Sequence, residues 1–129
     1  ALHLKARCLK SSIFINDGNG NFEMQHLPNE AQFSPIMGIV LEDINNDNYL
    51  DIIAAGNLYE TEVETVRFDA GRGVCLLGNG KGDFKPISPE VSGFFAWNNV
   101  KSLTTCKING RKAFVLSVNN SYPQIFIIE

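Results

Sequence analysis

The 129-residue sequence lacks several features that would each assign it to a familiar class of protein. It has no run near the roughly 20 apolar residues that a membrane-spanning helix requires, so membrane insertion is not expected. It has no excess of basic residues, since its net charge is −3, so we expect no binding to nucleic acid. Cysteine is scarce, and no CxxC spacing indicates a zinc or redox site. We expect Cys8, Cys75 and Cys106 to be free and mostly buried, rather than one disulfide with a thiol left over.

Helical periodicity is also absent. No segment keeps apolar residues at helical spacing for three turns, and short runs of β-branched and aromatic residues alternate instead with Gly, Asn and Asp. The segments NDGNGN (16–21) and GNGKGD (78–83) supply the positive-φ residues that tight hairpins need. With 44% hydrophobic residues, the chain can form a core. We therefore predict one all-β domain over residues 1–129.

The N-terminal segment, ALHLKARCLK, has no continuous apolar stretch of the kind found in a secretory signal peptide. Leu2, Leu4 and Ala6 alternate with polar residues instead. We expect this segment to belong to the mature chain, an expectation that says little about the compartment.

An internal repeat has a period of 62 residues. Gly18, Gly20 and Phe22 align with Gly80, Gly82 and Phe84, and the same offset continues without a gap to the pair Asn57 and Asn119. One period holds about four strands, which suggests the blades of a β-propeller. We predict two outer strands of one blade at 12–25, a complete blade at 34–88, and three strands of the next blade at 96–128.

A closed propeller needs about four to eight blades, which is more than this chain contains. The sequence is therefore consistent with part of a larger propeller, with a ring completed by identical copies, or with a smaller barrel or sandwich. An open propeller segment exposes apolar faces and strand edges at its ends. We expect self-association or contacts with further blades.

The segment DINNDNYLD (43–51) places three carboxylates within nine residues. Oxygen-bearing side chains at its positions 1, 3, 5 and 9 match the spacing of a loop around Ca²⁺, and position 7 contributes a backbone carbonyl. The predicted calcium ligands are Asp43, Asn45, Asp47, Tyr49 and Asp51.

Two alternatives to this calcium loop can be compared with it. An EF-hand would need Glu at position 12 and helices on both sides, but position 12 is Ala54 and both flanks have strand patterns. A solvated turn rich in Asp and Asn would need no metal. Repulsion among the carboxylates favours an ion over that plain turn. Asn48, which follows the third ligand, can adopt the left-handed conformation at modest cost.

The segment DINNDNYLDIIAAGN, preceded by INDGNGNF and followed by LLGNGKGDF, resembles the integrin-type FG-GAP family, in particular its bacterial VCBS-like branch. The loop of that family is D-x-[DN]-x-D-G-x-x-D, so Asn48 stands where the family has Gly. The resemblance covers residues 12–128. It implies a calcium-binding propeller blade in an extracellular or cell-surface protein, with adhesion, ligand recognition or carbohydrate-associated roles and a structural metal.

The second copy of the loop has lost its carboxylates. The positions equivalent to the four ligand side chains hold Thr105, Lys107, Asn109 and Ala113. We predict no calcium there, and Lys107 either takes the place of the ion or points to water.

Other candidates yield no catalytic residue, and no enzyme is predicted. Glu60, Glu62 and Glu64 alternate as on a solvated strand face, with a second cation site as the alternative. An aromatic cluster (Phe94, Phe95 and Trp97) is expected in the core between blades, or exposed as a sugar-stacking platform. A polysaccharide-acting propeller enzyme is an alternative function, but nothing in the sequence orients Asp69, Asp83 and Glu90 towards one another. An intracellular structural repeat protein is the other alternative.

Overall fold

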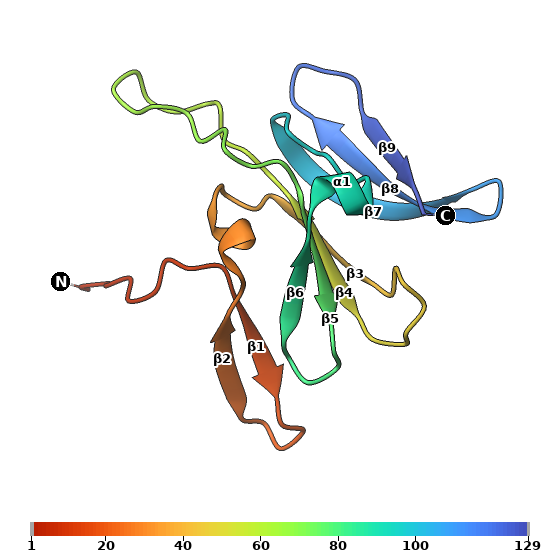
Figure 1. Cartoon of the computed structure of the whole chain (residues 1–129). Helices are drawn as coiled ribbons and strands as arrows, with labels where there is room; N and C mark the ends of the chain where they lie inside the picture. The colour runs from red at the N-terminus through yellow and green to blue at the C-terminus, as the bar shows by residue number, and fades with distance from the viewer. Residues whose placement is uncertain (1, 129) are drawn as a thin grey trace.

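The computed structural model describes residues 2–128, and it confirms an all-β chain with three antiparallel sheets and almost no helix (Figure 1). The first sheet contains β1 (Ser12–Asn16) and β2 (Phe22–His26). The second contains β3 (Gly38–Glu42), β4 (Asp51–Ala55), β5 (Val74–Gly78) and β6 (Phe84–Ile87), and the third contains β7 (Val100–Ile108), β8 (Arg111–Val118) and β9 (Gln124–Ile127). A 3-10 turn at Asn29–Gln32 and a short helix, α1 (Pro89–Ser92), join the sheets. Among the described residues, no helix has the length and apolarity needed to cross a membrane.

The 62-residue period of the sequence is also the period of the strands. β1 begins at Ser12 and β5 at Val74, while β3 begins at Gly38 and β7 at Val100, so both pairs are 62 residues apart. The hairpin turns match as well. Gly18 and Gly80, at equivalent places in the two turns, have φ angles of 80° and 71°. The repeat therefore describes one structural unit, whose turn residues have the predicted positive φ.

The middle of the second sheet is covered on both faces, and every residue of β4 is buried, but Ile39 and Leu41 on the edge strand β3 are exposed. One face packs towards the first sheet through Ile52, Ala54 and Leu76, and the other packs towards the third sheet through Ile53, Ala55 and Cys75. A strand covered on both faces has a continuous apolar sequence, as IIAA does. Full burial of an aliphatic side chain stabilises the fold by about 1.5–3 kcal/mol.

The second and third sheets approach each other most closely at their first strands, β3 and β7. A Cβ atom added to Gly38 would lie 2.5 Å from the backbone nitrogen of Leu103. Only glycine permits this approach of one strand to another. The contact sets the spacing of the two sheets.

Residues 56–73, which we call the excursion, leave the second sheet between β4 and β5 and extend away from it (Figure 1). Leu58 and Phe68 form an isolated bridge near its base, and Val63 and Val66 near its tip are exposed. Glu60, Glu62 and Glu64 are exposed, as predicted, but the prediction that they lie on a strand is wrong. Within residues 2–128, no neighbouring strand pairs with the tip, and the segment turns back on itself.

The cysteines only partly follow the prediction. All three are free, but Cys8 and Cys106 are exposed and only Cys75 is buried. Burial, together with the negative charge of Asp51, raises the pKa of the Cys75 thiol to about 11. Cys106 is exposed because its side chain lies on the opposite face of β7 from Leu103, which packs in the core.

Candidate metal centre

The predicted calcium loop connects β3 to β4, the first two strands of the four-stranded sheet. Asp43 follows directly after β3, and Asp51 is the first residue of β4. Two residues of the loop, Asn46 and Asn48, have positive φ angles of 61° and 68°. Asparagine adopts this conformation more readily than most residues, so Asn48 can serve where the FG-GAP pattern has glycine.

The loop is folded around the carboxylate of Asp43. Its Oδ1 accepts a hydrogen bond from the backbone N–H of Asp47 (3.2 Å), and its Oδ2 accepts one from the N–H of Asn48 (2.9 Å). Asp47 Oδ1 accepts from the N–H of Tyr49, two residues further on (2.8 Å), which is the bond of an Asx turn. The bonds to Asp43 and Asp47 direct backbone donors, which carry partial positive charge, at both carboxylates.

Asn45 brings the first and third predicted ligands together. Its Oδ1 accepts from the backbone N–H of Asp47 (3.1 Å), the same donor that Asp43 uses, and its Nδ2 donates to Asp47 Oδ2 (2.8 Å). Each of these oxygens has two lone pairs, so one hydrogen bond does not exhaust it. The structure therefore places Asp43, Asn45 and Asp47 in one small, exposed cluster.

Asp51 is set apart from this cluster, because its side chain is fully buried. Its Oδ2 accepts from the N–H of Ile44 in the loop (3.0 Å), and its Oδ1 accepts from the N–H of Gly78 at the end of β5 (2.9 Å). Asp51 thus ties the base of the loop to the neighbouring strand. The sequence indicated a ligand role only, because Gly78 lies 27 residues away.

The loop also packs on the β5–β6 turn. A Cβ atom added to Gly80 would lie 2.3 Å from Cδ1 of the Tyr49 ring, and one added to Gly78 would lie 2.2 Å from the carbonyl oxygen of Leu50. A side chain at either position would clash with the loop, so both positions require glycine. The Gly-rich turn, predicted only as a hairpin connection, also supports the loop.

The second copy of the loop is a two-residue hairpin turn. Asn109 and Gly110 have φ angles of 51° and 81°, as a type I′ turn requires, and strands β7 and β8 extend up to them. Lys107 is exposed and pairs with Lys112 across the strands. The expectation that Lys107 takes the place of an ion is wrong, because no loop encloses it. Lys112 instead forms an ion pair with Glu42, next to the first loop.

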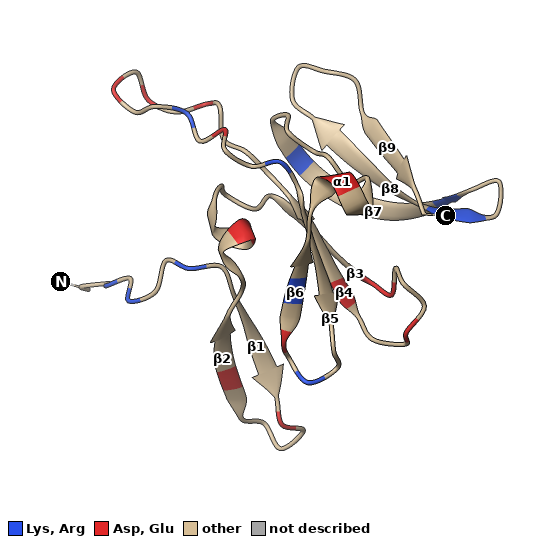
Figure 2. Ribbon diagram, viewed as in Figure 1, with Lys and Arg blue, Asp and Glu red and all other residues tan. Residues whose placement is uncertain are grey.

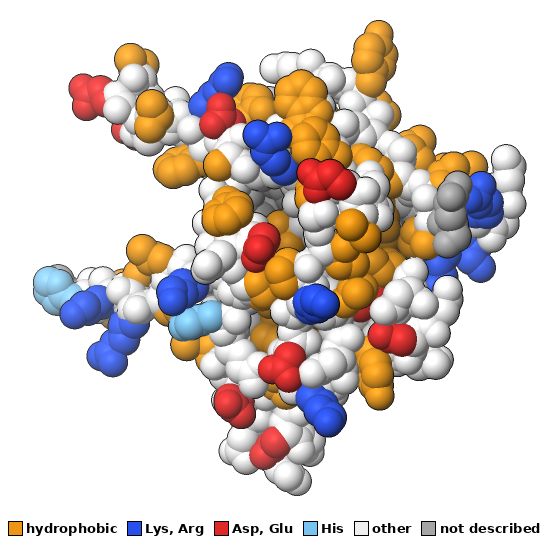
Figure 3. Space-filling model, viewed as in Figure 1, with side chains coloured by type: hydrophobic (Ala, Val, Ile, Leu, Met, Phe, Trp, Pro, Cys, Tyr) orange, Lys and Arg blue, Asp and Glu red, His pale blue; other side chains and the backbone are white. Residues whose placement is uncertain are grey.

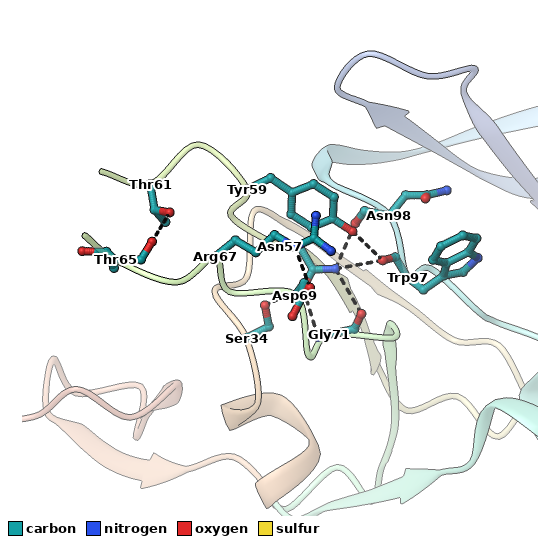
Figure 4. Close-up of polar contacts among 10 residues, drawn as sticks. All are labelled: Ser34, Asn57, Tyr59, Thr61, Thr65, Arg67, Asp69, Gly71, Trp97 and Asn98. Carbon is teal, nitrogen blue, oxygen red and sulfur yellow. Dashed lines mark hydrogen bonds and ion pairs between the residues drawn. The ribbon is translucent and has the colours of Figure 1, made fainter. Parts of the chain in front are cut away.

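A second polar centre is formed by Asn57, whose side chain is fully buried (Figure 4). Its Nδ2 donates to the carbonyls of Gly71, Trp97 and Asn98 at 3.0–3.1 Å. Its Oδ1 accepts from the Ser34 hydroxyl (2.6 Å) and from the Gly71 N–H (3.0 Å). Asn57 therefore joins the base of the excursion to the segment that leads into β7. The sequence indicated only that Asn57 repeats as Asn119.

The aromatic cluster divides between core and surface. Phe94 is buried, with ring centroids 6.1 Å from Phe114 and 4.9 Å from Phe126. Phe95 and Trp97 are 39% and 53% exposed. One member therefore packs between the second and third sheets, and two remain available to a ligand.

Exposed aromatic rings continue onto the excursion. The hydroxyl of Tyr59 donates to the carbonyl of Trp97 (3.3 Å), and the guanidinium of Arg67 lies 4.8 Å from the centre of the Tyr59 ring (Figure 4). Arg67 is paired with Asp69 at 2.7 Å. The base of the excursion thus carries aromatic and charged groups side by side.

Glu60 links the excursion to the third sheet. Its carboxylate accepts hydrogen bonds from Lys101 Nζ (2.8 Å), Asn99 Nδ2 (2.6 Å) and Asn119 Nδ2. The Lys101 ammonium first, and then the two amides, lower the pKa of Glu60 from 4.5 to about 2. Glu60 is exposed, as predicted, and it is also a polar anchor between the excursion and the third sheet.

The carboxylates considered for catalysis lie on three separate elements. Asp69 is paired with Arg67 in the excursion, Asp83 accepts from Asn79 in the β5–β6 turn (2.8 Å), and Glu90 lies on α1. A hydrogen bond from Ser88 lowers the pKa of Glu90. The local bonds of these groups hold each in its own element rather than around one substrate position.

The chain matches no family model, no curated protein and no solved structure in comparisons with known proteins. The resemblance to FG-GAP repeats therefore rests on the residues of this chain alone.

Proposed function

We propose that this chain is a calcium-binding repeat module built of propeller-type blades, in which the metal has a structural role. The observation that carries the proposal is the 43–51 loop. It gathers two carboxylates and an amide around shared backbone donors, and it is attached to the next hairpin through Asp51 and Tyr49. Through this attachment, metal binding in the loop would also affect the stability of the sheet.

Asp43, Asn45, Asp47 and the carbonyl of Tyr49 would hold the ion, and Asp51 would keep the base of the loop in place. Bound Ca²⁺ would neutralise the clustered carboxylates and lower their mutual repulsion. Within residues 2–128, no three His, Cys, Asp or Glu side chains form a ready-made group for a metal. Amide, carbonyl and water oxygens would therefore have to complete the ligand set, as they do for calcium generally.

The blade interpretation is supported by three observations: the period of 62, the face-to-face order of the three sheets, and the adjacent first strands β3 and β7. Within the described residues, the third sheet has no counterpart of β6. A cavity of about 680 Å³ lies between the second and third sheets, where it is lined by Cys75 and Leu77 on one side and by Phe126 and Ile127 on the other. Figure 3 shows hydrophobic side chains gathered in this region beside α1. A further blade or another copy of the chain would cover the third sheet where this strand is missing.

A binding role, rather than an enzymatic one, is supported by the surface at the base of the excursion. Phe95 and Trp97 are partly exposed, with the Arg72 guanidinium 5.8 Å from the centre of the Phe95 ring, and exposed aromatic rings suit stacking on sugars or contact with a protein. We infer an extracellular or cell-surface setting, where calcium is millimolar and even a weak site is filled. A carbohydrate or protein ligand is proposed at this surface.

Calcium-dependent melting tests the proposal. An ion that binds the folded state at 100 times its Kd adds about 2.7 kcal/mol to the free energy of unfolding, so Tm should rise with calcium and fall with chelator. Asp47→Ala should abolish this rise, whereas Asn109→Ala at the equivalent place in the second copy should retain it. A Tm that is the same in millimolar calcium and in chelator would contradict the proposal.

A further inference from the structure

Residues 2–10, which we call the N-terminal arm, belong to no sheet and extend away from the body of the molecule (Figure 1). Leu2, Leu4 and Leu9 are 86%, 86% and 92% exposed. Alternating leucines are typical of a strand that packs one face against a core. The arm therefore has a strand sequence without a strand partner.

A second internal match identifies which strand the arm corresponds to. β1 begins at Ser12 and β9 at Gln124, 112 positions later, and both strands contain the sequence IFI at 13–15 and 125–127. With the same offset, the sequence of residues 2–6 aligns with residues 114–118 of β8. Leu2 aligns with Phe114, Leu4 with Leu116 and Ala6 with Val118. The connecting segments, RCLKS at 7–11 and NNSYP at 119–123, have equal lengths. The arm thus corresponds to the strand that pairs with β9.

The matching position beside β1 is open. Within residues 2–128, β1 pairs with β2 only, so its other edge has unpaired backbone donors and acceptors. In the third sheet, Phe114 pairs with Phe126 and Leu116 pairs with Gln124. Subtracting 112 from each residue number predicts that Leu2 pairs with Phe14 and that Leu4 pairs with Ser12. Leu2 would then cover Phe14, which is 63% exposed.

The connection between arm and β1 disfavours a hairpin within one chain. NNSYP contains Asn120, with a φ angle of 54°, and Pro123, whereas RCLKS contains no Gly, Asn, Asp or Pro. Cys8 stands in the place of Asn120, where a positive φ is required. Ser11 is also held in place, since its N–H donates to Gln32 Oε1 (2.8 Å) and its carbonyl accepts from Gln32 Nε2 (3.0 Å).

Charge favours pairing between the arm and the β1–β2 hairpin. The arm carries Lys5, Arg7 and Lys10 and no acidic residue, whereas residues 12–26 carry Asp17 and Glu23 and no Lys or Arg (Figure 2). These opposite net charges favour the encounter of the arm with the hairpin.

We propose that residues 2–6 of one copy form a third strand on the open edge of β1 in a second copy, antiparallel and in the register Leu2 to Phe14 and Leu4 to Ser12. The exchange is reciprocal, so the two copies make a closed dimer. The partner of the β1 edge is therefore a second copy of the same chain. The proposal does not depend on calcium or on the proposed ligand surface.

Disulfide trapping between different chains tests the register. In a background with Cys8→Ser and Cys106→Ser, which removes the exposed thiols, Leu4→Cys protein is mixed with an equal amount of Ser12→Cys protein and oxidised mildly. We expect a disulfide between residues 4 and 12, identified by mass spectrometry. It should form in several-fold higher yield than in the matched mixture with Lys5→Cys, whose side chain points to the opposite face.

A disulfide yield no greater than that of the Lys5→Cys mixture overturns the proposal. So does a double variant, Leu4→Cys with Ser12→Cys in one chain, that closes only within monomers, because the arm would then fold back on its own β1. Sedimentation adds a second readout. The wild-type chain should dimerise at tens of micromolar, and Leu2→Lys with Leu4→Lys should be monomeric with an unchanged circular dichroism spectrum. A wild-type chain that remains monomeric overturns the proposal.

Discussion

Single aspartates of the 43–51 loop have different roles, although the sequence presents them as equivalent. Asp43 is half-buried and Asp47 is exposed, and both accept hydrogen bonds from within the loop. Asp51 is buried and accepts one bond from the loop and one from β5. Removing the carboxylate of Asp43 or Asp47 should therefore weaken metal binding, whereas removing the carboxylate of Asp51 should lower the stability of the fold.

Asp51→Asn should lower the free energy of unfolding by about 1–3 kcal/mol in chelator as well as in calcium, because an amide NH₂ would face the N–H of Ile44 or Gly78 and leave a buried donor unpaired. Denaturant unfolding with and without calcium measures this loss. Asp47→Asn is the matched control, and in chelator it should unfold nearly as the wild type does. Equal stability of the Asp51 variant and the wild type in chelator would exclude the anchoring role.

At the scale of single elements, the two Gly-rich hairpin turns can be compared. They share a sequence pattern, positive φ angles and the same network of side-chain bonds, with Asp17 in one turn replaced by Asn79 in the other. Their surroundings differ. A Cβ atom at Gly18 would meet nothing within 4 Å, whereas one at Gly80 would meet the Tyr49 ring.

Gly80→Ala should therefore be more destabilising than Gly18→Ala. Both variants place alanine at positive φ, which costs about 1–2 kcal/mol, and only the first forces a methyl group into a ring, which adds about 1–3 kcal/mol. The difference between their unfolding free energies isolates the packing of the loop on the turn. If the two variants lose equal stability, Tyr49 does not support the loop in solution.

At the scale of the whole molecule, polar contacts between distant segments hold the sheets together beside the apolar core. Asn57 and Glu60, at the base of the excursion, bond to residues 97–101 and to Asn119. The excursion therefore acts as a bracket between the second and third sheets. Its tip, with Val63 and Val66 exposed, takes no part in these contacts.

Glu60→Gln should lower Tm at neutral pH, and the difference from the wild type should disappear in acid. The folded state holds the pKa of Glu60 at about 2, below its ordinary value of 4.5. A lowered pKa stabilises the fold fully above the unfolded value and loses that effect as pH falls from about 4.5 towards 2. Tm measured from pH 7 to pH 2 gives the profile. Glu62→Gln, in the same excursion, should leave the curve unchanged, and a Glu60→Gln difference that persists at pH 2 would refute the ionic role.

Local features of the fold were predictable, because they depend on neighbouring residues. Glycines at positive φ mark the turns at 16–21 and 78–83, and short apolar runs beside these turns form strands. The strand arrangement of the excursion was predicted wrongly, because alternation in residues 60–64 has meaning only where a second strand lies beside them. The exposure of Cys106 could not be predicted either, since it depends on which face of the third sheet packs against the second sheet.

The sequence by itself determined the all-β class, the period of 62 and the positions of the hairpin turns, because backbone sterics and apolar alternation act over a few residues. Only the tertiary structure separated Asp51 from Asp43 and Asp47, brought Glu60 to Lys101, and placed Gly80 under Tyr49. The partners in these contacts lie 27 to 41 residues apart in the chain. Their pairing depends on how sheets stack and where segments leave them, which no local pattern specifies.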